Sequence, residues 1–300
     1  MGFYVRFWGT RGSIPTPGRT THRYGGNTSC VEIRFDDALF ILDGGTGLRE
    51  LGVDLMRRPQ RPVVAHMLFS HMHWDHIQGF PFFTPAYVPQ NTFTIYGATS
   101  GDRRFHQLLS GQMRSEYFPV DFSALHSHIV PSDLGELSAR TLDGVLVRCF
   151  VQRHPGGSFA YSLEKNGHRV VYATDNEIDL TLPDPSVVQR DLLAPRAIPS
   201  EFIEFCRGAD LLICDGQYTE AEYPSKVGWG HPRATTVVDA AVQAAVKQLA
   251  IFHHDPMQSD DDIEQKIGDC RSRARRLGSD CLIFAAREGV ELRLDTPLTP

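Results

Sequence analysis

The sequence lacks any apolar run long enough to cross a membrane. Its first residues, 1–6, also lack the positively charged segment and apolar stretch of a secretion signal. These two absences exclude the common forms of membrane insertion and export. We therefore expect a soluble, cytoplasmic protein.

Paired cysteines are also absent. The six cysteines are scattered through the chain, and no two of them form a Cys-x-x-Cys pair. This spacing argues against a disulfide framework, and most of the six lie in apolar stretches where a thiol acts as a small apolar side chain. Only at Cys214 does a thiolate metal ligand stay open as an alternative.

The chain has no excess of positive charge. Its formal net charge is −6 and its sequence pI is near 6.1, so no overall basic field is available to hold a nucleic-acid backbone. Nucleic acid is thus an unlikely partner, although a local basic patch stays open. With 300 residues, 41% of them hydrophobic, the chain is long enough to bury a large core, and we expect one domain over residues 1–300.

Short β-rich runs separated by turn residues fill much of the sequence. They predict strands at residues 3–8, 29–35, 38–42, 63–69, 93–96, 145–151, 159–163, 168–173, 209–214 and 249–252. Helical spacing predicts a helix over residues 235–249, and Ser259 followed by three aspartates predicts a second one to about Arg276. The pattern loosens at about residues 101–137, which indicates an inserted helical or loop segment. Strands in both halves, each half closing with helices, predict an α/β fold with two mixed sheets between helical layers.

The most informative segment is His71-Met72-His73-Trp74-Asp75-His76, which directly follows a predicted buried strand. Strand ends are where α/β folds place their chemistry. Three imidazoles and a carboxylate within six residues cannot all reach one tetrahedral ion, because structural zinc sites draw spaced ligands from two chain segments. The simplest assignment is two neighbouring metal ions, and the alternative is a solvated polar turn.

Three more candidate ligands each follow an apolar strand: His154, Asp175 and His253. With the first cluster they make five imidazoles and two carboxylates, enough for two ions that share one carboxylate. Six of the remaining histidines lack ligand spacing and are expected on the surface or on strand faces: His22, His66, His106, His126, His128 and His168. His254 is left open because it adjoins His253.

The order of these ligands resembles that of the metallo-β-lactamase superfamily. Residues Phe7 to Pro15 are similar to the start of its phosphodiesterase branch, so the resemblance covers nearly the whole chain. It implies a four-layer αββα sandwich. It also implies that His71, His73 and His154 hold one metal, that Asp75, His76 and His253 hold the other, and that Asp175 bridges them. Zinc is the metal expected first, with manganese or iron as alternatives.

Further residues acquire roles from the same resemblance. Asp43 is similar to an early aspartate that orients a ligand imidazole, and a plain turn aspartate is the alternative. His231 stands before a predicted helix, where the resemblance places a phosphate contact or proton donor, and a packing histidine is the alternative. Asp215 lies where tRNA-processing members have a His-Glu-Ala-Thr motif, but Cys214 replaces its histidine, which argues against tRNA 3′ processing. The Gly156-Gly157-Ser158 turn is a candidate oxyanion cradle.

We expect a metal-dependent hydrolase that cleaves a phosphodiester, most simply a small cyclic phosphate or cyclic nucleotide. Asp75 and His231 are the residues expected to take part in catalysis beyond holding metal. A lactone or thioester hydrolase with the same metal pair is the rival enzyme, and a metal-binding sensor without turnover is the rival from another class. A symmetric homodimer is the default assembly.

Overall fold

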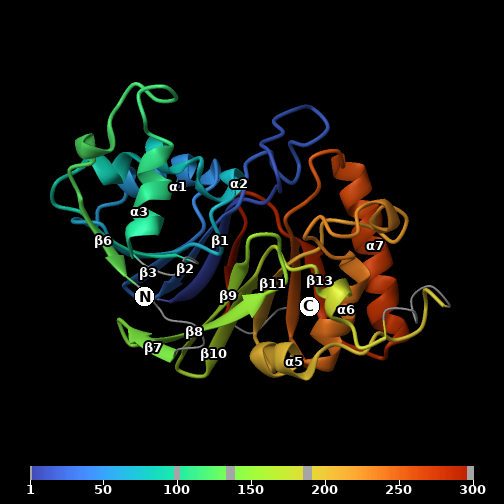
Figure 1. Cartoon of the computed structure of the whole chain (residues 1–300). Helices are drawn as coiled ribbons and strands as arrows, with labels where there is room; N and C mark the ends of the chain where they lie inside the picture. The colour runs from blue at the N-terminus through green and yellow to red at the C-terminus, as the bar shows by residue number, and fades with distance from the viewer. Residues whose placement is uncertain (1, 98–101, 133–138, 185–190, 296–300) are drawn as a thin grey trace. The chain divides into compact units, whose positions relative to one another are not determined.

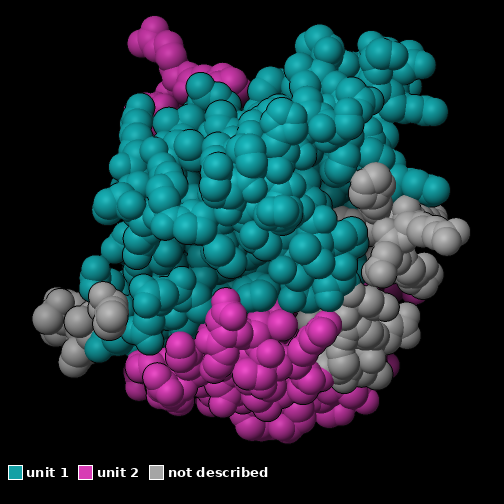
Figure 2. All heavy atoms as spheres, turned by 90° about the vertical axis from the view of Figure 1, so that its left-hand side faces the viewer, with its two compact units in different colours: residues 1–16, 25–135, 287–300 teal, residues 17–24, 136–286 magenta. Residues whose placement is uncertain are grey.

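A computed structural model describes residues 2–97, 102–132, 139–184 and 191–295. The chain divides into two compact units, which Figure 2 shows in two colours. Unit 1 comprises residues 1–16, 25–135 and 287–300, and unit 2 comprises residues 17–24 and 136–286. Each unit is built on one seven-stranded mixed sheet (Figure 1).

The sheet of unit 1 combines an antiparallel and a parallel half. Its strands, in spatial order, are β14 (Glu291–Arg293), β1 (Phe3–Gly9), β2 (Cys30–Phe35), β3 (Ala38–Leu42), β4 (Val64–Leu68), β5 (Thr92–Tyr96) and β6 (His128–Ser132). The pairs from β14 to β3 are antiparallel, and those from β3 to β6 are parallel. Parallel strands place their carboxyl ends at one edge of a sheet, so β3 and β4 deliver the residues that follow them to the same edge.

The helices of unit 1 bury one face of this sheet. They are α1 (Gly47–Arg57), α2 (Trp74–Ile77), α3 (Asp102–Gly111), η1 (Phe80–Phe82), η2 (Thr84–Tyr87) and η3 (Phe122–Ala124). Leu48, Leu51 and Leu55 recur at helical spacing on α1 and pack with Ile41 and Met67 of the sheet.

The sheet of unit 2 repeats the same division. Its order is β13 (Leu282–Ala285), β12 (Gln248–Phe252), β11 (Leu211–Asp215), β10 (His168–Ala173), β9 (Ser158–Lys165), β8 (Val145–Gln152) and β7 (Ala139–Leu142). The pairs from β13 to β10 are parallel, and those from β10 to β7 are antiparallel.

Helices α5 (Ser200–Cys206), α6 (Ala234–Gln243) and α7 (Asp260–Arg276) pack against the sheet of unit 2 (Figure 1), with the short turns η4 (Ile178–Thr181) and η5 (Tyr223–Ser225) beside them. Their apolar side chains share one core with those of β10, β11 and β12. At the start of α7, Ser259 and Asp262 form a reciprocal capping box, so the predicted start of this helix is confirmed.

The predicted fold class, two mixed sheets with flanking helices, is confirmed. Asn166 and Gly167 form a tight hairpin turn between β9 and β10, because both residues have positive φ and Lys165 pairs with His168. The helix predicted over 235–249 is wrong at its end: α6 stops at Gln243, and residues from 248 belong to β12. There Ala245 adopts a left-handed φ of 52°, and the amides of Ala245 and Val246 bond back to Val242 and Ala241, which closes a Schellman turn.

The stretch at about 101–137 contains α3, η3 and also the edge strand β6, which the sequence analysis did not predict. Residues 101 and 133–137 of this stretch lie outside the described part. Whether the stretch is an insertion, and whether 1–300 is one domain, stay predictions. No helix in the described part of the chain has the length and apolar composition needed to span a membrane.

Candidate metal centre

The histidine-rich motif lies where β4 ends and α2 begins, and its side chains form two close pairs. His71 Nε2 and His73 Nδ1 are 2.9 Å apart, and His76 Nε2 and Asp75 Oδ2 are 3.3 Å apart. Two ligands at 2.0–2.1 Å from one tetrahedral zinc ion lie about 3.3 Å from each other. The spacing of each pair therefore fits two ligands of a common ion.

Asp43 holds one of these imidazoles from behind. It follows β3 directly, is fully buried, and has a left-handed φ of 58°. His76 Nδ1 lies 2.8 Å from Asp43 Oδ2, and Ser70 donates both its backbone N–H and its hydroxyl to the same carboxylate. With Nδ1–H donating to Asp43, Nε2 of His76 is the nitrogen that could coordinate a metal. The orienting role is thus favoured over a plain turn aspartate.

Asp75 also has a partner that the sequence analysis missed. The backbone N–H of Ser13 donates to Asp75 Oδ2 at 2.7 Å, and Ser13 has a left-handed φ of 64°. The turn after β1 thereby fixes the orientation of this carboxylate. The only indication of this contact in the sequence was the position of Ser13 within the N-terminal Gly-Ser turn.

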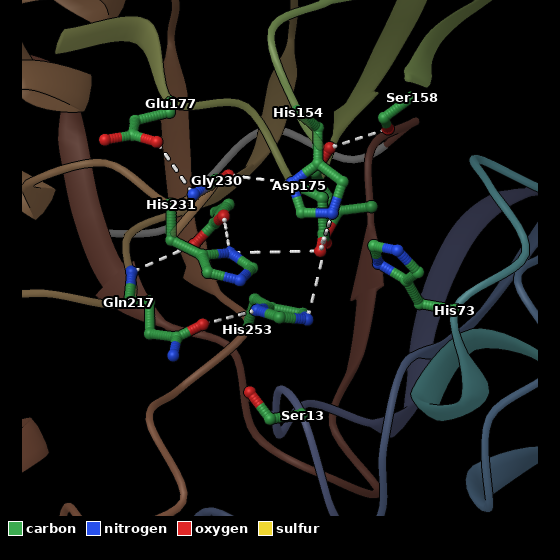
Figure 3. Close-up of polar contacts among 12 residues, drawn as sticks. Ser13, His73, His154, Ser158, Asp175, Glu177, Gln217, Gly230, His231 and His253 are labelled. Carbon is green, nitrogen blue, oxygen red and sulfur yellow. Dashed lines mark hydrogen bonds and ion pairs between the residues drawn. The ribbon is translucent and has the colours of Figure 1, made fainter. Parts of the chain in front are cut away.

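In unit 2, Asp175 lies at the centre of a buried cluster (Figure 3). Ligand atoms of Asp175, Asp215, His231 and His253 lie within 4.8 Å of one another. Oδ1 of Asp175 lies 3.3 Å from His253 Nε2, whereas Oδ2 lies 3.6 Å from His154 Nε2. The two oxygens of one carboxylate thus face two different imidazoles, an arrangement in which the carboxylate could bridge two ions.

Both imidazoles are held through Nδ1 (Figure 3). His154 Nδ1 donates to the carbonyl oxygen of Gly230 at 3.0 Å, and His253 Nδ1 donates to Gln217 Oε1 at 2.9 Å. These bonds fix the tautomer, so that Nε2 of each ring carries the lone pair for a metal. Gln217 lies two residues after β11. This position near a strand end was the only indication in the sequence that its side chain could orient a ligand.

Gln217 is in turn supported by a buried lysine of α7. Lys266 Nζ donates to the backbone oxygen of Gln217 at 3.0 Å and to Gln258 Oε1 at 2.7 Å. Burial lowers the pKa of Lys266 to about 8, because an ammonium ion loses hydration inside the protein. The orientation of the candidate ligand His253 therefore depends on a contact from α7 as well as on its position after β12.

His231 is paired with Asp215 rather than with a backbone group. His231 Nδ1 lies 2.8 Å from Asp215 Oδ2, and both side chains are buried. The His231 ring stacks on that of His253, with centroids 4.8 Å apart. As predicted, a helix begins just after His231: α6 starts at Ala234, and Asp179 accepts the N–H of Arg233 ahead of it.

The structure bears on two further candidates, the Gly156-Gly157-Ser158 turn and Cys214. Ser158 is buried, and its hydroxyl bonds with Gln152 and Thr174, while the N–H of Gly157 donates to His154 O. These two groups are engaged within the protein, which argues against an oxyanion cradle at this turn. Cys214 packs in the apolar core, and burial raises the pKa of its thiol well above the usual value. A core thiol is thus favoured over a thiolate ligand.

Residues 40–254 match the family described as Beta-lactamase superfamily domain. The chain belongs to the metallo-β-lactamase superfamily. Ribonuclease Z of Brevibacillus brevis is 23% identical over 91% of this chain and 92% of its own length. Ribonuclease Z of Methanosarcina acetivorans is 25% identical over 86% of this chain and 89% of its own length.

Solved structures show the same fold. The metallo-beta-lactamase fold protein YhfI of Bacillus subtilis has a TM-score of 0.69 at 18% identity, covering 97% of this chain and 98% of its own. The short form of human tRNase Z has a TM-score of 0.64 at 18% identity, covering 98% of this chain and all of its own. A diphosphatase from the PhnP family has a TM-score of 0.63 at 15% identity, with 97% of each chain covered.

Within this superfamily, the chain is a hydrolase with a histidine and aspartate cluster for metal binding. The side chains of this cluster fit a transition metal, because imidazole and carboxylate ligands together suit zinc, manganese or iron.

Proposed function

We propose that the protein is a two-metal phosphodiesterase acting on a small, most simply cyclic, phosphodiester. The observation that carries the proposal is the placement of the two Asp175 oxygens against two different imidazoles. The proposed ligand sets follow the superfamily order: His71, His73 and His154 for one ion, Asp75, His76 and His253 for the other, and Asp175 for both.

A bound metal pair would supply a water nucleophile of lowered pKa and would offset charge on the phosphate oxygens. The protein's own part begins with the carboxylate of Asp215. It holds His231 with Nδ1–H directed to Oδ2 and stabilises the protonated ring. His231 Nε2 can then donate a proton to the departing alkoxide oxygen.

Two observations favour phosphodiester over ester or thioester hydrolysis. The relatives include several proteins named Ribonuclease Z, and Asp215 with His231 provides a proton donor for a poor leaving group. An RNA phosphodiester is the second candidate because of those same relatives. The acidic net charge and the replacement of a motif histidine by Cys214 argue for a smaller substrate.

The test is a substrate panel on metal-replete protein. It contains a nucleoside 2′,3′-cyclic phosphate, bis(p-nitrophenyl) phosphate, a tRNA precursor, a lactone and a thioester. We expect kcat/KM for the best small phosphodiester to exceed that for the lactone and the thioester by at least about tenfold, which is about 1.4 kcal/mol of transition-state stabilisation. A preference for the lactone or thioester would reject the phosphodiesterase assignment, and a preference for the tRNA precursor would replace the small substrate by RNA.

A further inference from the structure

Residues 226–230, here called the Trp229 loop, form a fixed backbone segment immediately before His231. Glu177, buried below this loop, accepts the N–H groups of Gly228 and Gly230, both at 2.7 Å, and the hydroxyl of Tyr223 at 2.8 Å. Figure 3 shows Glu177 beside Gly230, which also accepts His154 Nδ1. Gly230 therefore connects this loop to His154, a candidate ligand.

The backbone of this loop is held by buried contacts, whereas the side chain of Trp229, between the two glycines, is exposed to water. Trp229 is 59% exposed, and the ammonium of Lys226 lies 3.9 Å from its ring centroid. Gly228 and Gly230 have φ of 85° and 94°, conformations that favour glycine and let the chain bend sharply on either side of Trp229. A rigid loop thus presents an exposed indole with a cation beside it.

The distribution of tryptophans adds an independent observation. The chain has three, and Trp8 is buried with its indole N–H donating to Glu32. The other two are exposed, and each adjoins candidate site residues in sequence: Trp74 stands between His73 and Asp75, and Trp229 stands two residues before His231. Single exposed aromatic rings are common, but a ring on a hydrogen-bonded loop next to candidate site residues presents a flat face that a planar ligand could cover.

We propose that Trp229 is a specificity-determining residue that stacks on the base of a nucleoside-bearing phosphodiester, with Lys226 supplying positive charge for its phosphate. This inference rests on the proposed function and narrows its substrate class. An aromatic face suits any nucleobase, and an ammonium beside it suits an anion, so the platform matches the two parts of a nucleotide. A lactone or thioester without an aromatic ring or a phosphate would make neither of these contacts.

The kinetic test compares adenosine 2′,3′-cyclic phosphate with ribose 2,3-cyclic phosphate, which lacks the base. Trp229→Ala should lower kcat/KM for the adenosine compound roughly ten- to hundredfold, the range for loss of one base–aromatic stack, and should leave the base-free compound unchanged. Trp229→Phe should recover most of the loss. Tyr117→Ala is the matched control, because Tyr117 is 76% exposed but adjoins no candidate ligand, and it should alter neither value. Equal losses on both substrates for Trp229→Ala would overturn the proposal.

A binding measurement separates this inference from the proposed function. Adenosine monophosphate should quench the tryptophan fluorescence of the metal-loaded protein, and most of that quench should disappear in Trp229→Phe but persist in Trp74→Phe. Quenching that is unchanged in Trp229→Phe would reject stacking on Trp229. A change of oligomeric state in Trp229→Ala would also reject it, because that result would indicate a protein interface instead. If neither cyclic phosphate is cleaved while a lactone is, the proposed function fails, and the fluorescence result still reports on the platform by itself.

Discussion

Each candidate ligand imidazole in unit 2 uses one ring nitrogen for a protein contact and directs the other to the cluster around Asp175. Gly230 holds His154, and Gln217 holds His253. His231 differs, because its Nδ1 is bonded to a carboxylate, Asp215, and a carboxylate stabilises a protonated ring. The candidate ligand His76 has the same kind of contact with Asp43, so the proton-donor role of His231 rests on the proposed ligand sets, which do not include it.

His231→Ala should lower kcat on the best phosphodiester roughly 10²- to 10⁴-fold, the range for loss of one general acid. The bound metal should remain, because the proposed ligand sets do not include His231. Steady-state kinetics and elemental analysis on the same preparation check both parts. His168→Ala, a half-exposed histidine near Asp210, is the control and should change neither quantity. Loss of metal together with activity would instead make His231 a ligand.

At this scale the sequence revealed the candidate ligands and, through the family resemblance, the orienting residue Asp43, but not the other residues that orient ligands. The motif His71 to His76 is local, so its spacing alone suggests metal binding. The orienting contacts join distant segments: Ser13 and Asp75 are 62 positions apart, and Gln217 and His253 are 36 apart. Glutamine or serine in a turn is common, and only the folded chain shows which of them faces a ligand.

At the scale of elements, strand ends determine where the candidate residues lie. Asp43 and His253 come directly after a parallel strand and Asp175 lies two residues after one, and each of the three has a left-handed φ between 53° and 58°. Such conformations cost free energy in a residue other than glycine, and they are concentrated at functional sites. The sharp turn after each strand keeps these side chains at the sheet edge.

Ala245, at the end of α6, has a similar conformation without a candidate role in the site. It is exposed and left-handed, at a position where helices most often have glycine. Ala245→Gly should raise the free energy of unfolding by roughly 0.5–1 kcal/mol, since relief of the strained φ exceeds the added flexibility of the unfolded chain. Urea denaturation followed by circular dichroism measures this change. Ala244→Gly, at the preceding buried helical position, should have the opposite sign; a loss of stability in both variants would refute the explanation.

The end of α6 also shows why the sequence misplaced it. Apolar residues continue without a break from α6 through Val246 into β12, so the period of the pattern does not reveal where the helix stops. The left-handed turn at Ala245 lacks the glycine that usually marks such an end. Strands β7, β13 and β14 were missed for another reason: each has only three or four residues and lies at or next to the edge of a sheet.

At the scale of the whole molecule, the two sheets have matching designs, each half antiparallel and half parallel. The candidate ligands likewise divide between the units, with His71, His73, Asp75 and His76 in unit 1 and His154, Asp175 and His253 in unit 2. The sequence predicted both sheets and both ligand groups, because strand periodicity and motif spacing are local signals. The role that we propose for Trp229 in substrate choice could not be predicted from the sequence, because the exposure of its side chain appears only in the folded structure.

The central claim is that one chain binds two metal ions through a shared Asp175, and elemental analysis of metal-replete protein tests it most directly. We predict close to two transition-metal equivalents per chain, and close to none in Asp175→Ala, because each proposed ion loses a ligand. Asp210→Asn is the matched control: this carboxylate bonds only with Arg169 and Lys247 among the hydrogen bonds of the described residues, and the variant should keep both ions. A stable single equivalent in the parent protein, or two equivalents retained in Asp175→Ala, would contradict the account.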